Sequence, residues 1–210
     1  MVRQSLPTVV RRYDRIARFY RGLEPIFLIR PKFRQKAVTQ LQLNTGDAVL
    51  EVGCGTGLNL PFLVDAVGPG GVVIGIDASA GMLDRARALA AHKGWQNVRL
   101  LQQDAARLDI DRDVDGVLFS LSYSVIPDPR SALARAWDLL DAGGRLVILD
   151  GTLPDNTLGR ALRPIARLLI RVAPGTADSR PWDDLAALSS PVETETFQPG
   201  IYYTCAITKS

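Results

Sequence analysis

Five short apolar runs follow one another through the middle of the chain, separated by polar or small residues. They are too short for typical helices and rich in Val, Ile and Leu, as expected of strands buried on both faces. We therefore expect strands at 48–52, 72–76, 98–102, 114–119 and 145–149. The segment 58–67 is compatible with a helix, and Ser79 can cap a second helix that runs to about His92. Strands that alternate with helices predict an α/β fold.

The last part of the chain has a different pattern, in which apolar and polar residues alternate. Residues 192–197 read V-E-T-E-T-F, with the charges on one face. Residues 202–209 are β-branched and aromatic, and Pro199-Gly200 between the two segments is typical of a turn. Two strands joined so closely predict an antiparallel hairpin that closes the domain.

The first apolar run ends in a loop of glycines, E-V-G-C-G-T-G at residues 51–57. Glycine permits positive φ and a close approach of the backbone to a ligand. The spacing is G-x-G-x-G rather than the G-x-G-x-x-G of dinucleotide enzymes, and no lysine follows it as in a phosphate-binding P-loop. A carboxylate at Glu51 would repel a phosphate and would suit a cationic or amine-bearing ligand.

Acidic residues follow the next two runs, where the carboxyl ends of parallel strands meet. Asp77 lies 20 residues after Gly57, placed to accept hydrogen bonds from the two ribose hydroxyls of a nucleoside; a capping role is the alternative. Asp104 can accept from an exocyclic amine such as adenine N6, or it is a solvated loop acid. Met82, in the first turn after Ser79, packs on a purine or fills the core. Together these positions favour a nucleoside site.

In combination, these residues resemble the class I S-adenosylmethionine-dependent methyltransferases. The matching pieces lie between about 45 and 150 and are E-V-G-C-G-T-G at 51–57, G-I-D-A-S at 75–79, Q-D-A at 103–105, D-G-V-L-F-S at 115–120 and L-L-D-A-G-G-R-L-V-I-L at 139–149. The resemblance implies a Rossmann-like, mostly parallel sheet of seven strands, ordered 3-2-1-4-5-7-6, with the last strand antiparallel and helices on both faces. Residues 13–20, Y-D-R-I-A-R-F-Y, are similar to the start of UbiE-like quinone methyltransferases and of bacterial phospholipid N-methyltransferases.

The resemblance also implies S-adenosyl-L-methionine as the cofactor. The glycine loop and Glu51 would hold its methionyl part, Asp77 its ribose, and Met82 and Asp104 its adenine. The expected cofactor-binding residues are Tyr13, Tyr20, Glu51, Gly53, Cys54, Gly55, Gly57, Asp77, Ala78, Met82, Asp104, Ala105 and Ser120. Methyl transfer from a sulfonium depends mainly on in-line geometry. If a general base is used, the candidates are Tyr20, Tyr123 and Asp150.

Composition bounds the domain organisation and the chemistry. The 210 residues suffice for one α/β domain. We expect a basic helical lid at 1–40 and a methyltransferase domain at 41–210, with an insertion at about 151–190 that defines the acceptor. Two cysteines without a CxxC pattern and one histidine leave no zinc set, so we expect no metal. Cys54 has no neighbouring histidine in sequence to activate it, and we do not expect it to be a nucleophile.

Charge is unevenly distributed along the chain. Residues 1–40 carry ten basic and two acidic side chains, hence +8, and the remainder carries 15 basic and 20 acidic, hence −5. Residues 8–23 have one apolar stripe at helical spacing with arginines largely opposite, and this segment can close the cleft or lie on anionic lipid. Residues 159–172 form an apolar segment with a narrow stripe of arginines, which fits a substrate lid or a membrane surface: Arg160, Arg163, Arg167 and Arg171.

These patterns leave four functional hypotheses. The preferred one is methyl transfer to a lipophilic acceptor, either a quinone precursor or a phospholipid headgroup. A methyltransferase of a soluble small molecule or natural product, an NAD-linked oxidoreductase and a non-catalytic binding module are the alternatives. Nucleic acid is disfavoured because no basic groove with interleaved aromatics is evident. No apolar run is long enough to cross a membrane and no signal-peptide pattern is evident, so we expect a cytoplasmic protein, peripheral at the inner membrane face.

Overall fold

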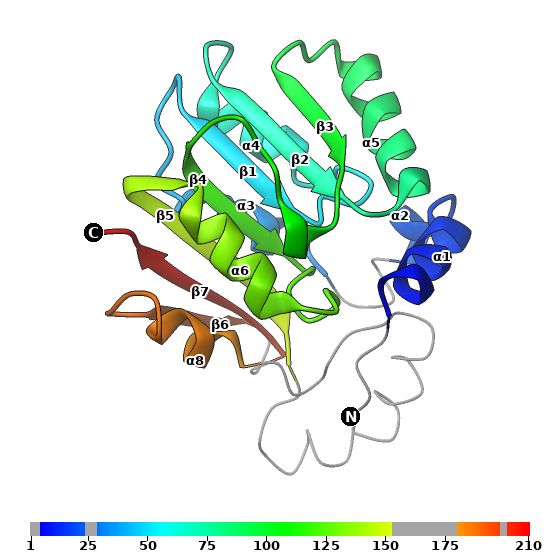
Figure 1. Ribbon diagram of the computed structural model, residues 1–210. Coiled ribbons are helices and arrows are strands. Elements are labelled where there is room, and N and C mark those ends of the chain that lie inside the picture. The colour runs from blue at the N-terminus through cyan, green and yellow to red at the C-terminus, as the bar shows by residue number, and fades with distance from the viewer. Residues whose placement is uncertain (1–4, 24–28, 153–179, 198–200) are drawn as a thin grey trace.

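The computed structural model describes residues 5–23, 29–152, 180–197 and 201–210. Its centre is a seven-stranded sheet with the strand order β3-β2-β1-β4-β5-β7-β6, which confirms the expected topology (Figure 1). The strands are β1 (Ala48–Val52), β2 (Val72–Asp77), β3 (Val98–Gln102), β4 (Val114–Ser120), β5 (Leu140–Gly151), β6 (Glu193–Phe197) and β7 (Tyr202–Thr208). The predicted turn at Pro199-Gly200 lies outside the described residues.

The first five strands are parallel, and β7 runs antiparallel between β5 and β6. All five residues of β1 are buried, which explains why its sequence is a continuous apolar run interrupted only by Glu51. The expected strand at 145–149 is only the second half of β5. This strand begins at Leu140 and shifts its register against β4 between Val114 and Gly116.

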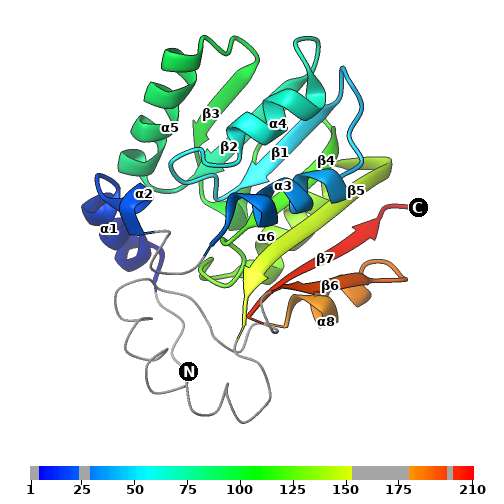
Figure 2. The same ribbon diagram turned by 180° about the vertical axis from the view of Figure 1, so that it is seen from behind.

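Helices cover both faces of the sheet, as Figures 1 and 2 show from opposite sides. One face is covered by α3 (Pro31–Gln40), α4 (Leu60–Val67) and α5 (Ala80–Lys93), which contribute to one buried apolar cluster. The other face is covered by α6 (Pro129–Asp138), the short helix η2 (Ala105–Arg107) and α8 (Pro181–Ala186). The predicted cap of α5 is confirmed, because Ser79 Oγ accepts a hydrogen bond from Met82 N.

The N-terminal segment corrects one expectation. Residues 8–23 do not form one helix: α1 (Leu6–Ile16) and α2 (Tyr20–Leu23) are separated by a turn at 17–19. The turn redirects the chain, and the rings of Tyr13 and Tyr20 then lie 6.2 Å apart at an angle of 56°. Both helices lie at the end of the sheet beside the start of α5 (Figures 1 and 2).

The arginine segment and most of the expected insertion lie outside the described residues, which include none of 153–179. Among the helices that are described, none combines the length and apolar character needed to span a bilayer. The described residues also contain no cluster of three or more His, Cys, Asp or Glu side chains suited to a metal ion.

Candidate functional site

A cleft opens at the carboxyl ends of β1, β2 and β4, the position where open α/β sheets bind ligands. It encloses about 820 Å³ of empty space, including the part open to solvent. Its walls come from both helices of the N-terminal segment, from α3, and from the loops that follow the first four strands. The lining residues include twelve of the thirteen expected cofactor residues: Tyr13, Tyr20, Glu51, Gly53, Cys54, Gly55, Asp77, Ala78, Met82, Asp104, Ala105 and Ser120. Gly57 is not among the described residues that line the cleft.

The glycine loop lines the cleft, and glycine is favoured at position 53 by a close contact and at position 55 by a positive φ. A Cβ on Gly53 would lie 2.6 Å from Ser122 Cβ, so a side chain there would collide with the loop after β4. Gly55 has φ +54°, and a Cβ there would meet no atom within 4 Å. The backbone at Gly55 therefore borders open space in the cleft, where a ligand can approach it closely.

Glu51 is fully buried beneath this loop. Its Oε1 accepts a hydrogen bond from Asn59 Nδ2, whereas its Oε2 has no hydrogen-bond partner among the residues that the structure describes. Burial raises the pKa of Glu51 from its ordinary value of 4.5 to about 7, although the Asn59 bond and the charge of Arg34 lower it. A buried carboxylate oxygen without a donor is costly, and an ammonium group in the cleft would supply the missing donor.

Arg34 belongs to the same buried network, although its sequence context gave no sign of it. The Arg34 side chain reaches the cleft from α3, and its Nη1 donates to Asn59 Oδ1 at 3.1 Å and to Ser120 Oγ at 3.2 Å. Asn59 thereby joins the guanidinium to Glu51. Opposite charges at one end of a cleft match an amino-acid zwitterion, whose ammonium and carboxylate need one partner each.

Asp77 lies at the tip of β2 and lines the cleft. Its Oδ2 accepts from Gly55 N and its Oδ1 from Ser79 N, each at 2.9 Å. Burial raises the pKa of Asp77, while these backbone donors lower it. Each carboxylate oxygen can accept a further hydrogen bond, so Asp77 can fix the glycine loop and still receive two hydroxyl donors.

Three other expected cofactor residues, Met82, Asp104 and Cys54, also line the cleft. Met82 is buried in the first turn of α5, and Asp104 Oδ1 caps η2 by accepting from Ala106 N at 3.1 Å. Both the capping interpretation and the ligand interpretation of Asp104 therefore remain open, because its second oxygen is not used by the cap. Burial raises the pKa of the Cys54 thiol well above its ordinary value, which opposes formation of a thiolate nucleophile.

Apolar residues also line the cleft. They come from α1 and from the loop after β4: Leu6, Val9, Leu121, Val125, Ile126 and Pro127. That loop is fixed to its neighbours: Leu121 N donates to Leu149 O at 2.7 Å, and Ser122 Oγ donates to Val52 O at 2.6 Å. These residues suit an apolar group rather than a charged one.

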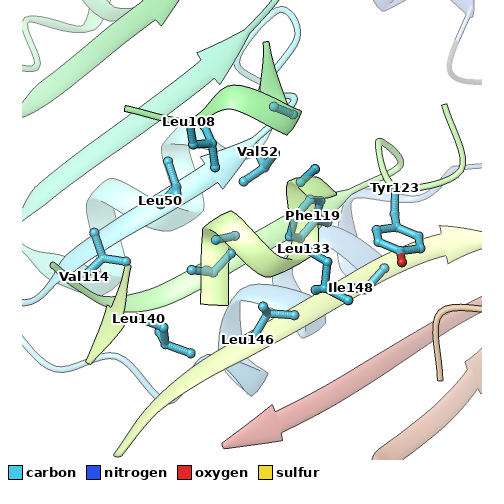
Figure 3. Close-up of a cluster of buried hydrophobic side chains, with 14 of the residues drawn as sticks. Leu50, Val52, Leu108, Val114, Phe119, Tyr123, Leu133, Leu140, Leu146 and Ile148 are labelled. Carbon is cyan, nitrogen blue, oxygen red and sulfur yellow. The ribbon is translucent and has the colours of Figure 1, made fainter. Parts of the chain in front are cut away.

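The three candidate bases occupy different places. Tyr20 lines the cleft beside Tyr13, whose pKa burial raises well above its ordinary value. The Tyr123 hydroxyl donates to Asp184 Oδ2 at 2.7 Å, and its ring packs in the cluster under α6 (Figure 3). Asp150 is buried and accepts hydrogen bonds from Ser124 N, Ser124 Oγ and Gly151 N. Neither Tyr123 nor Asp150 is among the described residues that line the cleft.

Comparison with known proteins agrees with this geometry. The sheet order, the glycine loop and the strand-tip carboxylates define an α/β domain built to hold a nucleoside-like ligand. Residues 49–144 match a family model described as "Methyltransferase domain". This part of the chain is therefore similar in sequence to methyltransferase domains, and solved methyltransferases share its fold.

Three curated relatives illustrate the range of similarity. An aklanonic acid methyltransferase of Streptomyces sp. strain C5 is 40% identical over 52% of this chain and 53% of its own. A demethylmenaquinone methyltransferase of Symbiobacterium thermophilum is 31% identical over 68% of this chain and 58% of its own. A phosphatidylethanolamine N-methyltransferase of Cereibacter sphaeroides is 39% identical over 50% of this chain and 51% of its own. The matches thus span little more than half of the length of these relatives.

Solved structures share the fold at low identity. A chain in the Haloferax volcanii complex of the Trm112 methyltransferase activator with a methyltransferase aligns with a TM-score of 0.74. It is 18% identical, and the alignment covers 96% of this chain and 98% of that one. A SAM-dependent methyltransferase from Aquifex aeolicus aligns with a TM-score of 0.60 at 19% identity over 97% and 98%.

Proposed function

We propose that the chain transfers a methyl group from S-adenosyl-L-methionine to a lipophilic acceptor. The observation that carries this proposal is that one cleft is lined both by the carboxylates of Glu51 and Asp77 and by apolar residues of α1 and of the loop after β4. The unpartnered Glu51 Oε2 and the open space over Gly55 fit the methionyl part of the cofactor, and Asp77 fits its ribose. When bound, the cofactor supplies a methyl group on a positively charged sulfur that is a good leaving group.

The residues of the chain would then act by binding, orientation and exclusion of water. Glu51 would hold the ammonium, Arg34 the carboxylate and Asp77 the ribose hydroxyls. Leu6, Val9, Tyr13 and Tyr20 cover the cleft and would keep water away from the transfer. In-line placement of acceptor, methyl and sulfur near 3 Å can supply several kcal/mol of the barrier without a base.

Calorimetry and labelled transfer test this proposal together. The full chain should bind S-adenosylmethionine and S-adenosylhomocysteine and should not bind NAD, which an NAD-linked oxidoreductase would. Labelled methyl groups should then appear on a demethylated naphthoquinol or on phosphatidylethanolamine vesicles. Cofactor binding without transfer to any acceptor in lipid and quinone extracts would favour the non-catalytic binding module instead.

A soluble acceptor is the second candidate. This alternative is supported by the relative that is 40% identical, because its name gives a small organic acid, aklanonic acid, as the acceptor. The apolar wall formed by Val125, Ile126 and Pro127 suits a flat aromatic acceptor as well as a quinone ring. Transfer to water-soluble aromatic acids, with none to the naphthoquinol or the vesicles, would select this alternative.

We also propose that the N-terminal basic segment contacts an anionic membrane at the cytoplasmic face. Three arginines of this segment are exposed, Arg11, Arg15 and Arg18, and Phe19 between the two helices is 70% exposed. An exposed aromatic ring among arginines suits the headgroup region of an anionic bilayer. Binding to vesicles that contain phosphatidylglycerol should fall in Phe19→Ser and in the charge reversals of Arg160, Arg163, Arg167 and Arg171. Unchanged sedimentation of both variants would contradict the membrane contact.

A further inference from the structure

One contact joins the N-terminal helix α1 to the start of α5. Asp14 projects from α1, and its Oδ1 accepts hydrogen bonds from Ser79 Oγ and, at 3.0 Å, from Gly81 N. Both donors belong to the start of α5, more than sixty positions away in the sequence. The two helices lie side by side in both views (Figures 1 and 2).

The same contact continues into the cofactor site. Ser79 N donates to Asp77 Oδ1, and Asp77 Oδ2 in turn accepts from Gly55 N. A continuous chain of hydrogen bonds therefore runs from Asp14 on α1 to the glycine loop. The position of α1 and the position of the proposed ribose carboxylate are set by one connected network.

Gly81 gives independent evidence that α1 packs against the start of α5. A Cβ at position 81 would lie 3.2 Å from Asp14 Oδ1 and 3.3 Å from Asp14 Cα. These distances are tighter than ordinary van der Waals contact, so Asp14 would have to move. Glycine is also a poor residue for the first turns of a helix. Its presence in α5 is explained by the close approach of α1.

We propose that Asp14 and Gly81 form a latch that holds α1 closed over the bound cofactor. The inference rests on the proposed function, because it assumes that the cleft binds S-adenosylmethionine. Leu6, Val9 and Tyr13 of α1 line the cleft only while α1 is docked. Apparent affinity falls in proportion to the fraction of molecules that are closed, so the latch residues are positioning residues for the cofactor.

Calorimetry with S-adenosylhomocysteine on the full chain tests the latch. Asp14→Ala should weaken binding about tenfold, the size expected when a charge-assisted hydrogen-bonded contact is lost. Asp14→Asn should weaken binding less, by about threefold, because the amide oxygen retains both hydrogen bonds but not their charge assistance. Arg85→Ala, an exposed change on α5, the helix that carries Gly81, is the matched control and should leave binding unchanged.

Gly81→Ala tests the same contact by a change on α5 instead of α1. Alanine is the better helix former, so the thermal unfolding temperature of the unliganded variant should not fall. Its affinity for S-adenosylhomocysteine should nevertheless fall about threefold or more, because α1 is displaced. A residue with a purely structural role would not separate stability from affinity in this way, and this variant remains informative if Asp14→Ala folds poorly.

Hydrogen exchange of the α1 amides supplies a readout that does not require cofactor binding. Without ligand, α1 should exchange faster in Asp14→Ala than in wild type, and S-adenosylhomocysteine should protect α1 less in both latch variants. Wild-type affinity and wild-type exchange in Asp14→Ala and Gly81→Ala would overturn the latch. A wild-type chain that does not bind S-adenosylhomocysteine would instead refute the proposed function, and the exchange of unliganded α1 would still decide the latch.

Discussion

Replacement of Glu51 by Gln tests the electrostatic centre of the cleft. Glutamine has nearly the same volume, and its Oε1 can still accept the hydrogen bond from Asn59 Nδ2. The change therefore removes the ionisable group from a fully buried position and leaves the packing nearly intact. Any change in the pH dependence of stability then reports the titration of Glu51 itself.

The size of the effect follows from the two pKa values. Burial raises the pKa of Glu51 from 4.5 to about 7 in the folded chain. A carboxyl whose pKa is raised by folding stabilises the folded state below pH 4.5, and this contribution is lost as the pH rises through 7. The gap between the two pKa values corresponds to about 3 kcal/mol. The Glu51→Gln variant has no such group and should not lose this stability as the pH rises.

Urea unfolding of the unliganded chain at pH 5 and pH 8 measures the difference. The stability of Glu51→Gln relative to wild type should be about 2 to 3 kcal/mol greater at pH 8 than at pH 5. Glu195→Gln, a change on edge strand β6 away from the cleft, is the matched control. The Glu51→Gln variant should also bind S-adenosylmethionine at least about tenfold more weakly, because the ammonium loses its charged partner.

The number of protons released on cofactor binding is a second measure of the ionisation of Glu51. At pH 6 about nine-tenths of the folded wild-type chains would carry a proton on Glu51. An ammonium beside Glu51 favours the charged carboxylate, so cofactor binding at pH 6 should release close to one proton more from wild type than from the variant. Parallel stability profiles together with equal proton release in the two proteins would refute the assigned role of Glu51.

Two further predictions concern the strand-tip carboxylates. Asp77→Ala should lower the affinity for S-adenosylmethionine at least about tenfold, or 1.4 kcal/mol, since the ribose hydroxyls and Gly55 N both lose their acceptor; unchanged affinity in calorimetry would exclude Asp77 as the ribose ligand. Asp150→Asn should speed hydrogen exchange at residues 124–127 while S-adenosylhomocysteine affinity stays within about twofold of wild type. Unaltered exchange in that loop would show that Asp150 does not hold it in place.

The strands were predictable because their physical signals are local and redundant, whereas their order followed only from the resemblance to a known family. Apolar runs such as 48–52 are buried on both faces, and no helix-like stripe competes with them. The acid at the tip of β2 could be placed because parallel strands end at one edge, which is where Asp77 meets the glycine loop. The break between α1 and α2 was not predictable in this way, since the apolar stripe at 9, 13, 16 and 20 continues across it.

Arg34 and Asn59 show which part of the site a single sequence conceals. Arg34 stands in a basic stretch that looks like a solvated surface, and nothing local marks its burial. Its partners Asn59 and Ser120 lie 25 and 86 positions away, brought together only by the packing of α3 on the sheet. The signal that could have found it is the unbalanced charge of Glu51, because a buried carboxylate calls for donors and a cation nearby.

Tyr123 and Asp150 illustrate the same limit for catalytic residues. Tyr123 follows β4, and Asp150 follows the strand that the sequence predicted at 145–149, so position alone made them candidates. The structure provides Tyr123 with Asp184 and Asp150 with three donors, so the hydrogen bonds of both groups serve the loop after β4. That loop presents Val125, Ile126 and Pro127 to the cleft. These two residues therefore bear on which acceptor fits, through the shape of the apolar wall.

The carboxylates and the apolar residues that line the cleft follow different physical rules, and this difference bears on specificity. Glu51 and Asp77 bond to Asn59 or to backbone, so a side-chain change there alters charge and is costly. The apolar residues act through shape, where exchange of one aliphatic residue for another costs little and admits a different acceptor. Acceptor specificity should accordingly change with substitutions at Val125 and Ile126, while cofactor affinity stays constant.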